Sequence, residues 1–143
     1  MTATDEPAAF LLETNIQFYS ISRDPAEAAK RERALRLLDD DDGALSVQVL
    51  QEFNVQATRA SRPDPIPHDL AVGPIGIWLR FAIQEITLPL LTAALKIEVV
   101  SGFSNWDSAI IAAARALGCR RLCSEDMSHG RQIDGVTIVN PFR

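Results

Sequence analysis

The most informative stretch of the chain is Ala8-Ala9-Phe10-Leu11-Leu12-Glu13-Thr14-Asn15, which changes from apolar to polar residues at a single acid. Residues 8–12 form a short apolar run bounded by Pro7, which predicts a buried strand. A short helical turn is expected over residues 15–19. An acid that ends a buried strand needs a partner. Glu13 therefore indicates a site at the carboxyl end of this strand.

Outward from this stretch, short apolar segments alternate with helical segments along the whole chain. Further strands are expected at residues 44–46, 86–88, 122–124 and 136–139. Helices are expected at residues 25–38, 46–60, 75–84, 89–100 and 104–117, and a proline-rich loop at residues 62–74. This alternation predicts one α/β domain over residues 1–143, built on a mostly parallel sheet.

The composition describes an ordinary globular protein of 143 residues, with 47% hydrophobic and 23% charged residues. The formal charge of −5 argues against broad wrapping of duplex nucleic acid, although it leaves room for a local basic rim. Cys119 and Cys123 lack the paired spacing of a zinc module and are expected to be buried, reduced thiols. No apolar run is long enough to cross a membrane, and Asp5 and Glu6 do not suit a signal peptide. A cytoplasmic protein is expected.

Four acids are candidates for one site. Glu13 closes the first strand, Glu52 lies in the helix after the second strand, Asp107 lies in the first turn of a helix, and Asp126 follows the fourth strand. In open parallel sheets, ligands bind beyond the carboxyl ends of the strands. Because carboxylates repel one another unless a divalent cation holds them, four acids at one edge predict a metal site.

Each acid also has a simpler interpretation. Asp107 could complete a capping box with Ser104, Glu52 could be a solvated helix acid, and Asp126 could be a turn residue. Glu13 could be a partnered core carboxylate. The run of residues 39–42, four aspartates, is expected to be the solvated exit of a helix, because adjacent side chains diverge.

Five segments together resemble one family. They are residues 11–15, 45–53, 106–114, 124–130 and 133–142. In this order they resemble the PIN-domain ribonucleases, specifically the VapC-like toxins of type II toxin–antitoxin systems. The resemblance implies a PIN-like three-layer sandwich, in which helices flank a short-stranded, mostly parallel sheet.

The resemblance also implies an activity. Glu13, Glu52, Asp107 and Asp126 occupy the acidic positions that hold Mg²⁺ or Mn²⁺ in the family, which implies endonucleolytic cleavage of single-stranded RNA. A cognate antitoxin that blocks the metal site and a homodimer are expected by the same resemblance. Contacts that orient the carboxylates or touch the substrate are expected from a further set of residues, namely Thr14, Asn15, Ser124 and Arg131.

Glu13 departs from the family pattern, in which the first acid is characteristically aspartate. The extra methylene places the carboxylate about 1.5 Å further from the backbone. Because Mg²⁺ demands near-ideal octahedral geometry, this extension could weaken metal binding. The alternative hypothesis is therefore a catalytically weak or inactive PIN-fold module that binds or regulates. A phosphohydrolase of small phosphates is less well supported, because the chain has no Gly-rich phosphate cradle.

Overall fold

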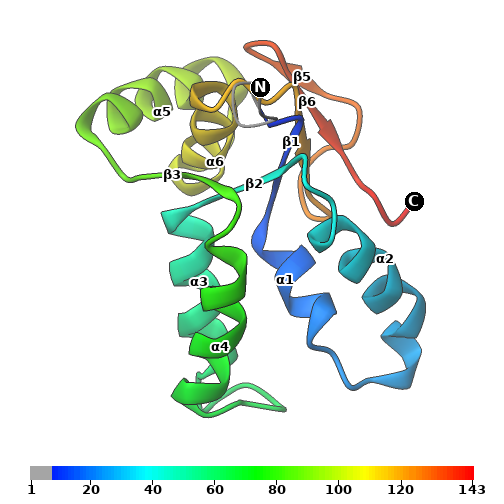
Figure 1. The fold of residues 1–143 in the computed structure, drawn as a ribbon. Coiled ribbons are helices and arrows are strands. Elements are labelled where there is room, and N and C mark those ends of the chain that lie inside the picture. Colours follow the sequence, from blue (N-terminus) through cyan, green and yellow to red (C-terminus); the bar gives the residue numbers. More distant parts are fainter. Residues whose placement is uncertain (1–7) are drawn as a thin grey trace, which may run out of the picture.

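The computed structural model describes residues 8–143, so Asp5, Glu6 and Pro7 lie outside the described residues. The strands are β1 (Phe10–Leu12), β2 (Gly43–Ser46), β3 (Ala82–Gln84), β4 (Arg121–Cys123), β5 (Gln132–Ile133) and β6 (Val136–Val139). The helices are α1 (Thr14–Ser20), the 3₁₀ turn η2 (Pro25–Glu27), α2 (Ala28–Leu38), α3 (Val47–Ala57), α4 (His68–Trp78), α5 (Leu88–Ser101) and α6 (Asn105–Ala116). Figure 1 shows their arrangement.

The strands form one sheet in the order β3-β2-β1-β4-β6-β5. All pairs are parallel except β5 with β6, which is antiparallel. β1 lies near the middle, where Leu11 is paired with Ala44 on one side and with Leu122 on the other. The expected mostly parallel sheet is confirmed, and the carboxyl ends of β1, β2 and β4 meet at one edge.

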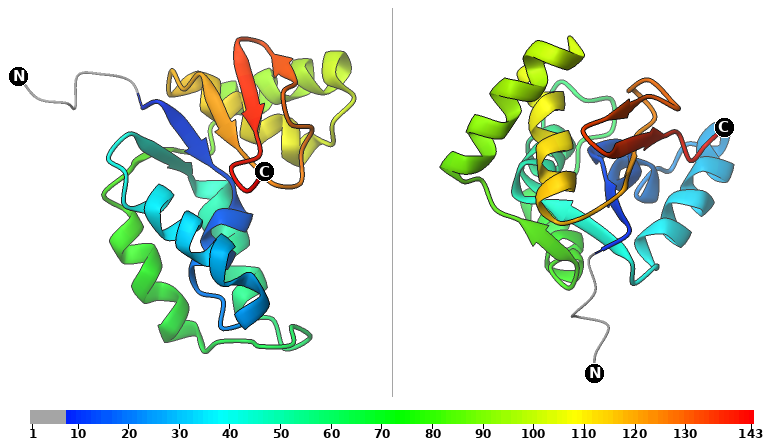
Figure 2. Two further views of the ribbon diagram at one scale, coloured as in Figure 1. Left: turned by 90° about the vertical axis from the view of Figure 1, so that its right-hand side faces the viewer. Right: turned by 90° about the horizontal axis from the view of Figure 1, so that it is seen from above.

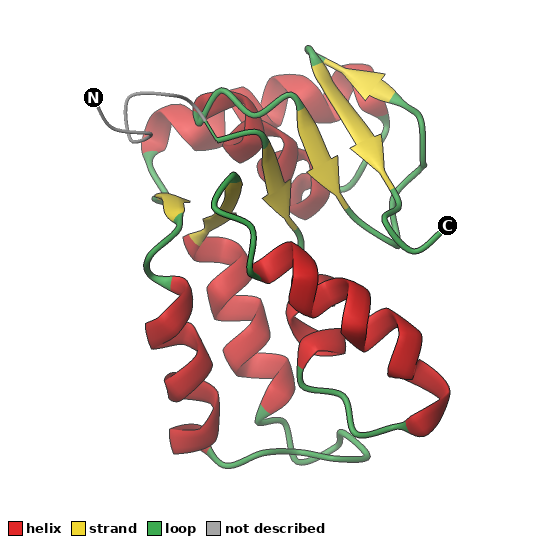
Figure 3. Ribbon diagram, turned by 45° about the vertical axis from the view of Figure 1, so that its right-hand side comes forward, coloured by secondary structure: helices red, strands yellow, loops and turns green. Residues whose placement is uncertain are grey.

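Helices lie on both sides of the sheet. Seen from above, α5 and α6 lie on one side and α1 and α2 on the other (Figure 2). α3 and α4 pack against each other and extend below the strands (Figure 3). The three-layer arrangement expected from the sequence is therefore present. None of the described helices is long and apolar enough to cross a membrane.

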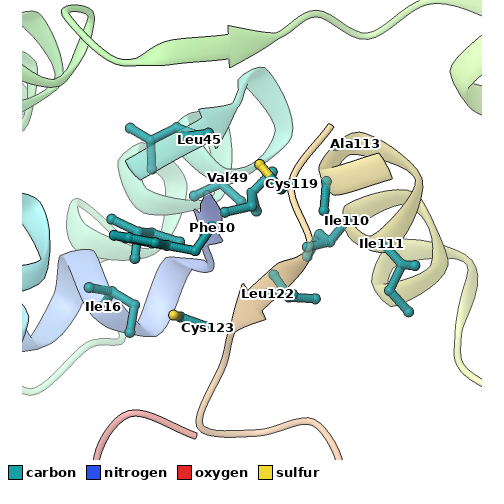
Figure 4. Packing of buried hydrophobic residues seen from close by; sticks show 14 of the residues in the cluster. Phe10, Ile16, Leu45, Val49, Ile110, Ile111, Ala113, Cys119, Leu122 and Cys123 are labelled. Atoms are coloured by element: carbon teal, nitrogen blue, oxygen red, sulfur yellow. The ribbon is translucent and has the colours of Figure 1, made fainter. Parts of the chain in front are cut away.

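The core forms between these layers, where buried side chains from the sheet meet those of the helices. Leu45 and Leu122 from the sheet and Ile16 and Ile110 from the helices belong to this cluster (Figure 4). Cys119 and Cys123 are also buried, and both are free thiols, as expected. Burial raises the pKa of each thiol to about 11, so both stay protonated at neutral pH.

Side-chain caps fix where several helices begin. The Ser46 Oγ accepts a hydrogen bond from the Val49 amide at the start of α3, and Thr87 does the same for Leu90 at the start of α5. Each cap satisfies an otherwise unpaired backbone donor. The cap at Ser46 therefore fixes where the chain leaves β2, and with it the position of Glu52 along α3.

The region between α3 and α5 differs from the sequence-based prediction. The strand expected at residues 86–88 is wrong, because Thr87 caps α5 and both Ile86 and Leu88 are exposed. The third strand is β3 instead, so the helix expected at residues 75–84 is wrong beyond residue 78, where α4 ends. The loop expected at residues 62–74 is wrong from residue 68 onward, because those residues belong to α4. α4 starts at residue 68 and contains Pro74, because burial of Ala71 and Trp78 keeps the helix intact around that proline.

Candidate carboxylate site

Glu13 lies where β1 ends and α1 begins. Its Oε2 accepts hydrogen bonds from the Ser124 Oγ at 3.0 Å and from the Asn15 Nδ2 at 3.0 Å. Ser124 can reach it because β4 pairs with β1, which places Cys123 opposite Leu12. Sheet register and the first turn of α1 thus hold this carboxylate at the edge of the sheet.

Glu52 is held by two donors, one from α1 and one from its own helix, α3. The Thr14 Oγ1 donates to its Oε2 at 2.9 Å, and the Gln48 Nε2 donates to its Oε1 at 3.2 Å. Gln48 also donates to the carbonyl of Trp106, at 3.1 Å, and so connects α3 to the start of α6. Sequence reasoning missed Gln48, although its position one turn before Glu52 on the same helix face was a usable signal.

Asp107 and Asp126 complete the set. The Ser104 Oγ accepts from the Asp107 amide at 3.1 Å, so the expected helix cap is present. This cap leaves the Asp107 carboxylate in the first turn of α6, next to the sheet edge. The Asn15 Nδ2, which also bonds Glu13, donates to the Asp126 Oδ2 at 3.3 Å. Asn15 therefore bridges the first and last acids of the set.

Hydrogen bonds bring the four carboxylates together, because Asn15 joins Glu13 to Asp126 and Gln48 joins Glu52 to the carbonyl beside Asp107. Burial raises the pKa of Glu13 from 4.5 to about 7; the hydrogen bond from Ser124 opposes this rise, and the charges of Asp126, Glu52 and Asp107 add to it. Burial, followed by the charges of Glu52 and Asp126, also raises the pKa of Asp107. The four acids predicted from separate segments do lie around one place at the carboxyl edge of the sheet.

The oxygen ligands at this site suit a divalent metal ion, but their spacing does not yet match one. Carboxylate oxygens are the ligands that Mg²⁺ and Mn²⁺ prefer. The buried Oδ1 of Asn15 has no hydrogen-bond partner within residues 8–143, which leaves one more oxygen at the site for a cation. Among residues 8–143, however, no three His, Cys, Asp or Glu side chains lie close enough together to hold an ion without moving. The chemistry fits a hard divalent cation, and the side chains would need to converge on it.

Three polar residues in the segment after β4 bond to other parts of the protein and not to the four acids. The Arg131 Nη2 donates to the carbonyl of Ser101 at 2.6 Å, and its guanidinium stacks on Phe103. The His129 Nδ1 accepts from a backbone amide. The Tyr19 hydroxyl and the Lys30 ammonium donate to the carboxylate of Glu125, so this acid is paired outside the set of four. The RNA contact expected of Arg131 stays a prediction.

Solved structures with the same fold cover most of the chain. VapC20 from Mycobacterium tuberculosis, described as a Sarcin-Ricin loop cleaving toxin, is 21% identical with a TM-score of 0.62, over 80% of this chain and 87% of that one. A toxin–antitoxin complex from Klebsiella pneumoniae is 18% identical with a TM-score of 0.67, over 93% and 98%. VapBC2 from Rickettsia felis, bound to promoter DNA, is 18% identical with a TM-score of 0.61, over 91% and 96%. No protein-family model and no curated protein matches the chain.

Proposed function

Because this chain has the PIN-like fold of the VapC toxins, we propose that it is a metal-dependent endoribonuclease toxin that a cognate antitoxin neutralises. The observation that carries the proposal is the gathering of four carboxylates from the end of β1, from α3, from α6 and from the loop after β4. A solved neighbour described as a Sarcin-Ricin loop cleaving toxin supports the choice of RNA as substrate. The reaction proposed is hydrolysis of a phosphodiester bond in single-stranded RNA, leaving a 5′-phosphate and a 3′-hydroxyl.

Glu13, Glu52, Asp107 and Asp126 would hold Mg²⁺ or Mn²⁺. When bound, such an ion supplies Lewis-acid chemistry, which neutralises charge on a phosphodiester and eases loss of a proton from water.

The neighbouring side chains keep these carboxylates in position. Ser124 and Asn15 both donate to the Oε2 of Glu13. Thr14 donates to one carboxylate oxygen of Glu52 and Gln48 donates to the other. Such hydrogen bonds orient a ligand and tune its basicity. These contacts support the predicted role of Thr14, Asn15 and Ser124 in orienting the carboxylates.

A second candidate function is a catalytically weak or inactive PIN-fold module. Two observations favour it: glutamate stands at position 13, and no three acids in residues 8–143 are preset around an ion. Misplacement of a catalytic group by about 1 Å can cost about 10²-fold in rate. The toxin is the better-supported proposal, because the extra methylene of Glu13 still leaves its carboxylate bonded to Ser124 and Asn15.

The partners of the proposed toxin are an antitoxin, an RNA and a second copy of the chain. Two of the solved neighbours are toxin–antitoxin complexes, which supports the first. Leu88, Leu91, Leu95 and Val99 expose an apolar stripe along α5, which supports a homodimer. A cytoplasmic location agrees with two free cysteines, because such thiols persist in reducing compartments.

Cleavage of a labelled single-stranded RNA by the purified protein tests the proposal. Activity should require Mg²⁺ or Mn²⁺ and should disappear on chelation. Asp107→Ala should lose at least about 10²-fold in rate, because it removes a carboxylate from the site. Asp41→Ala, which removes an exposed acid from the turn before β2, is the matched control. Equal cleavage by both variants would refute the proposed site.

A further inference from the structure

Two adjoining hollows lie beyond the far end of α1. The smaller, of about 150 Å³, is lined by Arg23 and Arg62 together with Ile21. The larger, of about 460 Å³, shares Ile21 and Arg23 with the first and adds Arg31. Because they share two lining residues, they form one continuous surface, named here the basic hollow, with three arginines along it.

These arginines keep their donors available. None of Arg23, Arg31 and Arg62 forms a salt bridge within the described part of the chain. Asp24 and Asp64 also line the hollows, but the Asp24 carboxylate is engaged in capping η2. With three arginines against two aspartates, the basic hollow carries more positive than negative charge, on a protein whose formal net charge is −5.

The basic hollow is connected to the carboxylate site through one face of α1. The guanidinium of Arg62 stacks on the ring of Phe18, 4.7 Å from its centroid. Phe18 is four residues after Thr14, so both lie on the same face of the helix. Thr14 in turn holds Glu52. Four residues span about 6 Å along a helix axis, so Arg62 packs beside Phe18 about one helical turn beyond Thr14, the residue that holds Glu52.

We infer that the basic hollow binds backbone phosphates of the RNA strand whose cleavage is proposed above, with Arg62 and Arg23 as its phosphate-binding residues. The identity of the ligand rests on the proposed function. The guanidinium fork matches phosphate oxygens, and its plane also stacks on unpaired bases. Four acids at the carboxylate site repel phosphates nearby, so an acidic protein needs separate cations to hold the rest of the strand.

RNA binding by arginine variants tests this inference. Fluorescence anisotropy of a labelled single-stranded RNA is measured with Mg²⁺ in an Asp107→Asn background, which separates binding from cleavage. Arg62→Gln and Arg23→Gln should each weaken binding several-fold. Each should also lower the slope of log K against log salt by about 0.7, the value for one lost phosphate contact on a single strand. Arg62→Gln could disturb folding, because Arg62 stacks on Phe18. Arg23 stacks on no ring among residues 8–143, so Arg23→Gln tests phosphate binding on its own.

Arg120→Gln is the matched control, because Arg120 is exposed just before β4, at the opposite edge of the sheet from the acids. Equal weakening by all three variants would mean diffuse charge only and would overturn the inference. Unchanged RNA binding, with loss of binding to an acidic peptide instead, would make the hollow a protein-docking site and would also overturn it.

Cleavage by the protein with native Asp107 separates this inference from the proposed function. If that protein binds RNA through these arginines without cutting it, the proposed function fails and the phosphate site stands. If it cuts RNA and Arg62→Gln leaves KM unchanged, the inference fails alone.

Discussion

The partly buried carboxylate of Glu13 should make the stability of the metal-free protein fall as the pH rises. The pKa of Glu13 is raised from 4.5 to about 7 in the folded protein, chiefly by burial. The folded state therefore keeps a proton that the unfolded chain releases above pH 4.5. The resulting stability is fully present below about pH 4.5 and is lost as the pH rises through about 7.

The size of this effect follows from the pKa change. One pKa unit corresponds to about 1.4 kcal/mol, so a rise from 4.5 to about 7 corresponds to about 3 kcal/mol between the two ends of the window. Glu13→Gln removes the titration while keeping an oxygen that can accept from Ser124 and Asn15. We expect this variant to gain up to about 3 kcal/mol over the wild type at pH 8 and little at pH 4.

Urea unfolding in the presence of a chelator, at pH 4, 6 and 8, measures this difference directly. Glu85→Gln is the matched control, because Glu85 is exposed and its replacement should change the free energy of unfolding by no more than about 0.5 kcal/mol. If the wild type and Glu13→Gln keep a constant difference from pH 4 to pH 8, Glu13 is not held protonated in the folded protein and the electrostatic description of the site is wrong.

Three further outcomes follow from the same structure. Mg²⁺ at pH 8 should raise the melting temperature of the wild type more than that of Glu13→Gln, because a cation favours the ionised carboxylate; equal shifts would place the ion elsewhere. Ser124→Ala should raise the pKa of Glu13 above about 7, since the lost hydrogen bond lowers it; an unchanged midpoint in the pH dependence of stability would contradict this. Phe53→Ala should cost about 3–5 kcal/mol in urea unfolding, because the ring is fully buried against Phe18 and Trp78; a cost below about 1 kcal/mol would show a loosely packed core.

The sequence was most informative where one local rule dominates. Ser104 caps α6 and Ser46 caps α3, as expected, because a cap depends on a few adjacent residues. β1 and β6 were found because a buried parallel strand is an almost continuous apolar run. The meeting of the four acids followed from the rule that parallel strands end at one edge.

Prediction failed where packing overrode local preference. Pro74 indicated a loop, but the buried Ala71 and Trp78 keep it inside α4. The bonds of Gln48 to Glu52 and to the Trp106 carbonyl join two helices, so no single segment of sequence contains the information. For the same reason the sequence could not show that Arg131 is tied to Ser101.

Single-turnover cleavage of a single-stranded RNA by the wild type beside Glu13→Asp tests whether the protein is a metal-dependent ribonuclease. We expect the wild type to cleave in Mg²⁺ or Mn²⁺ and chelation to abolish cleavage. Glu13→Asp should change the rate by less than about tenfold, because the longer side chain is already held by Ser124 and Asn15. A silent wild type would refute the proposed ribonuclease activity. If Glu13→Asp then cleaves strongly, glutamate at this position makes the protein a catalytically weak PIN-fold module.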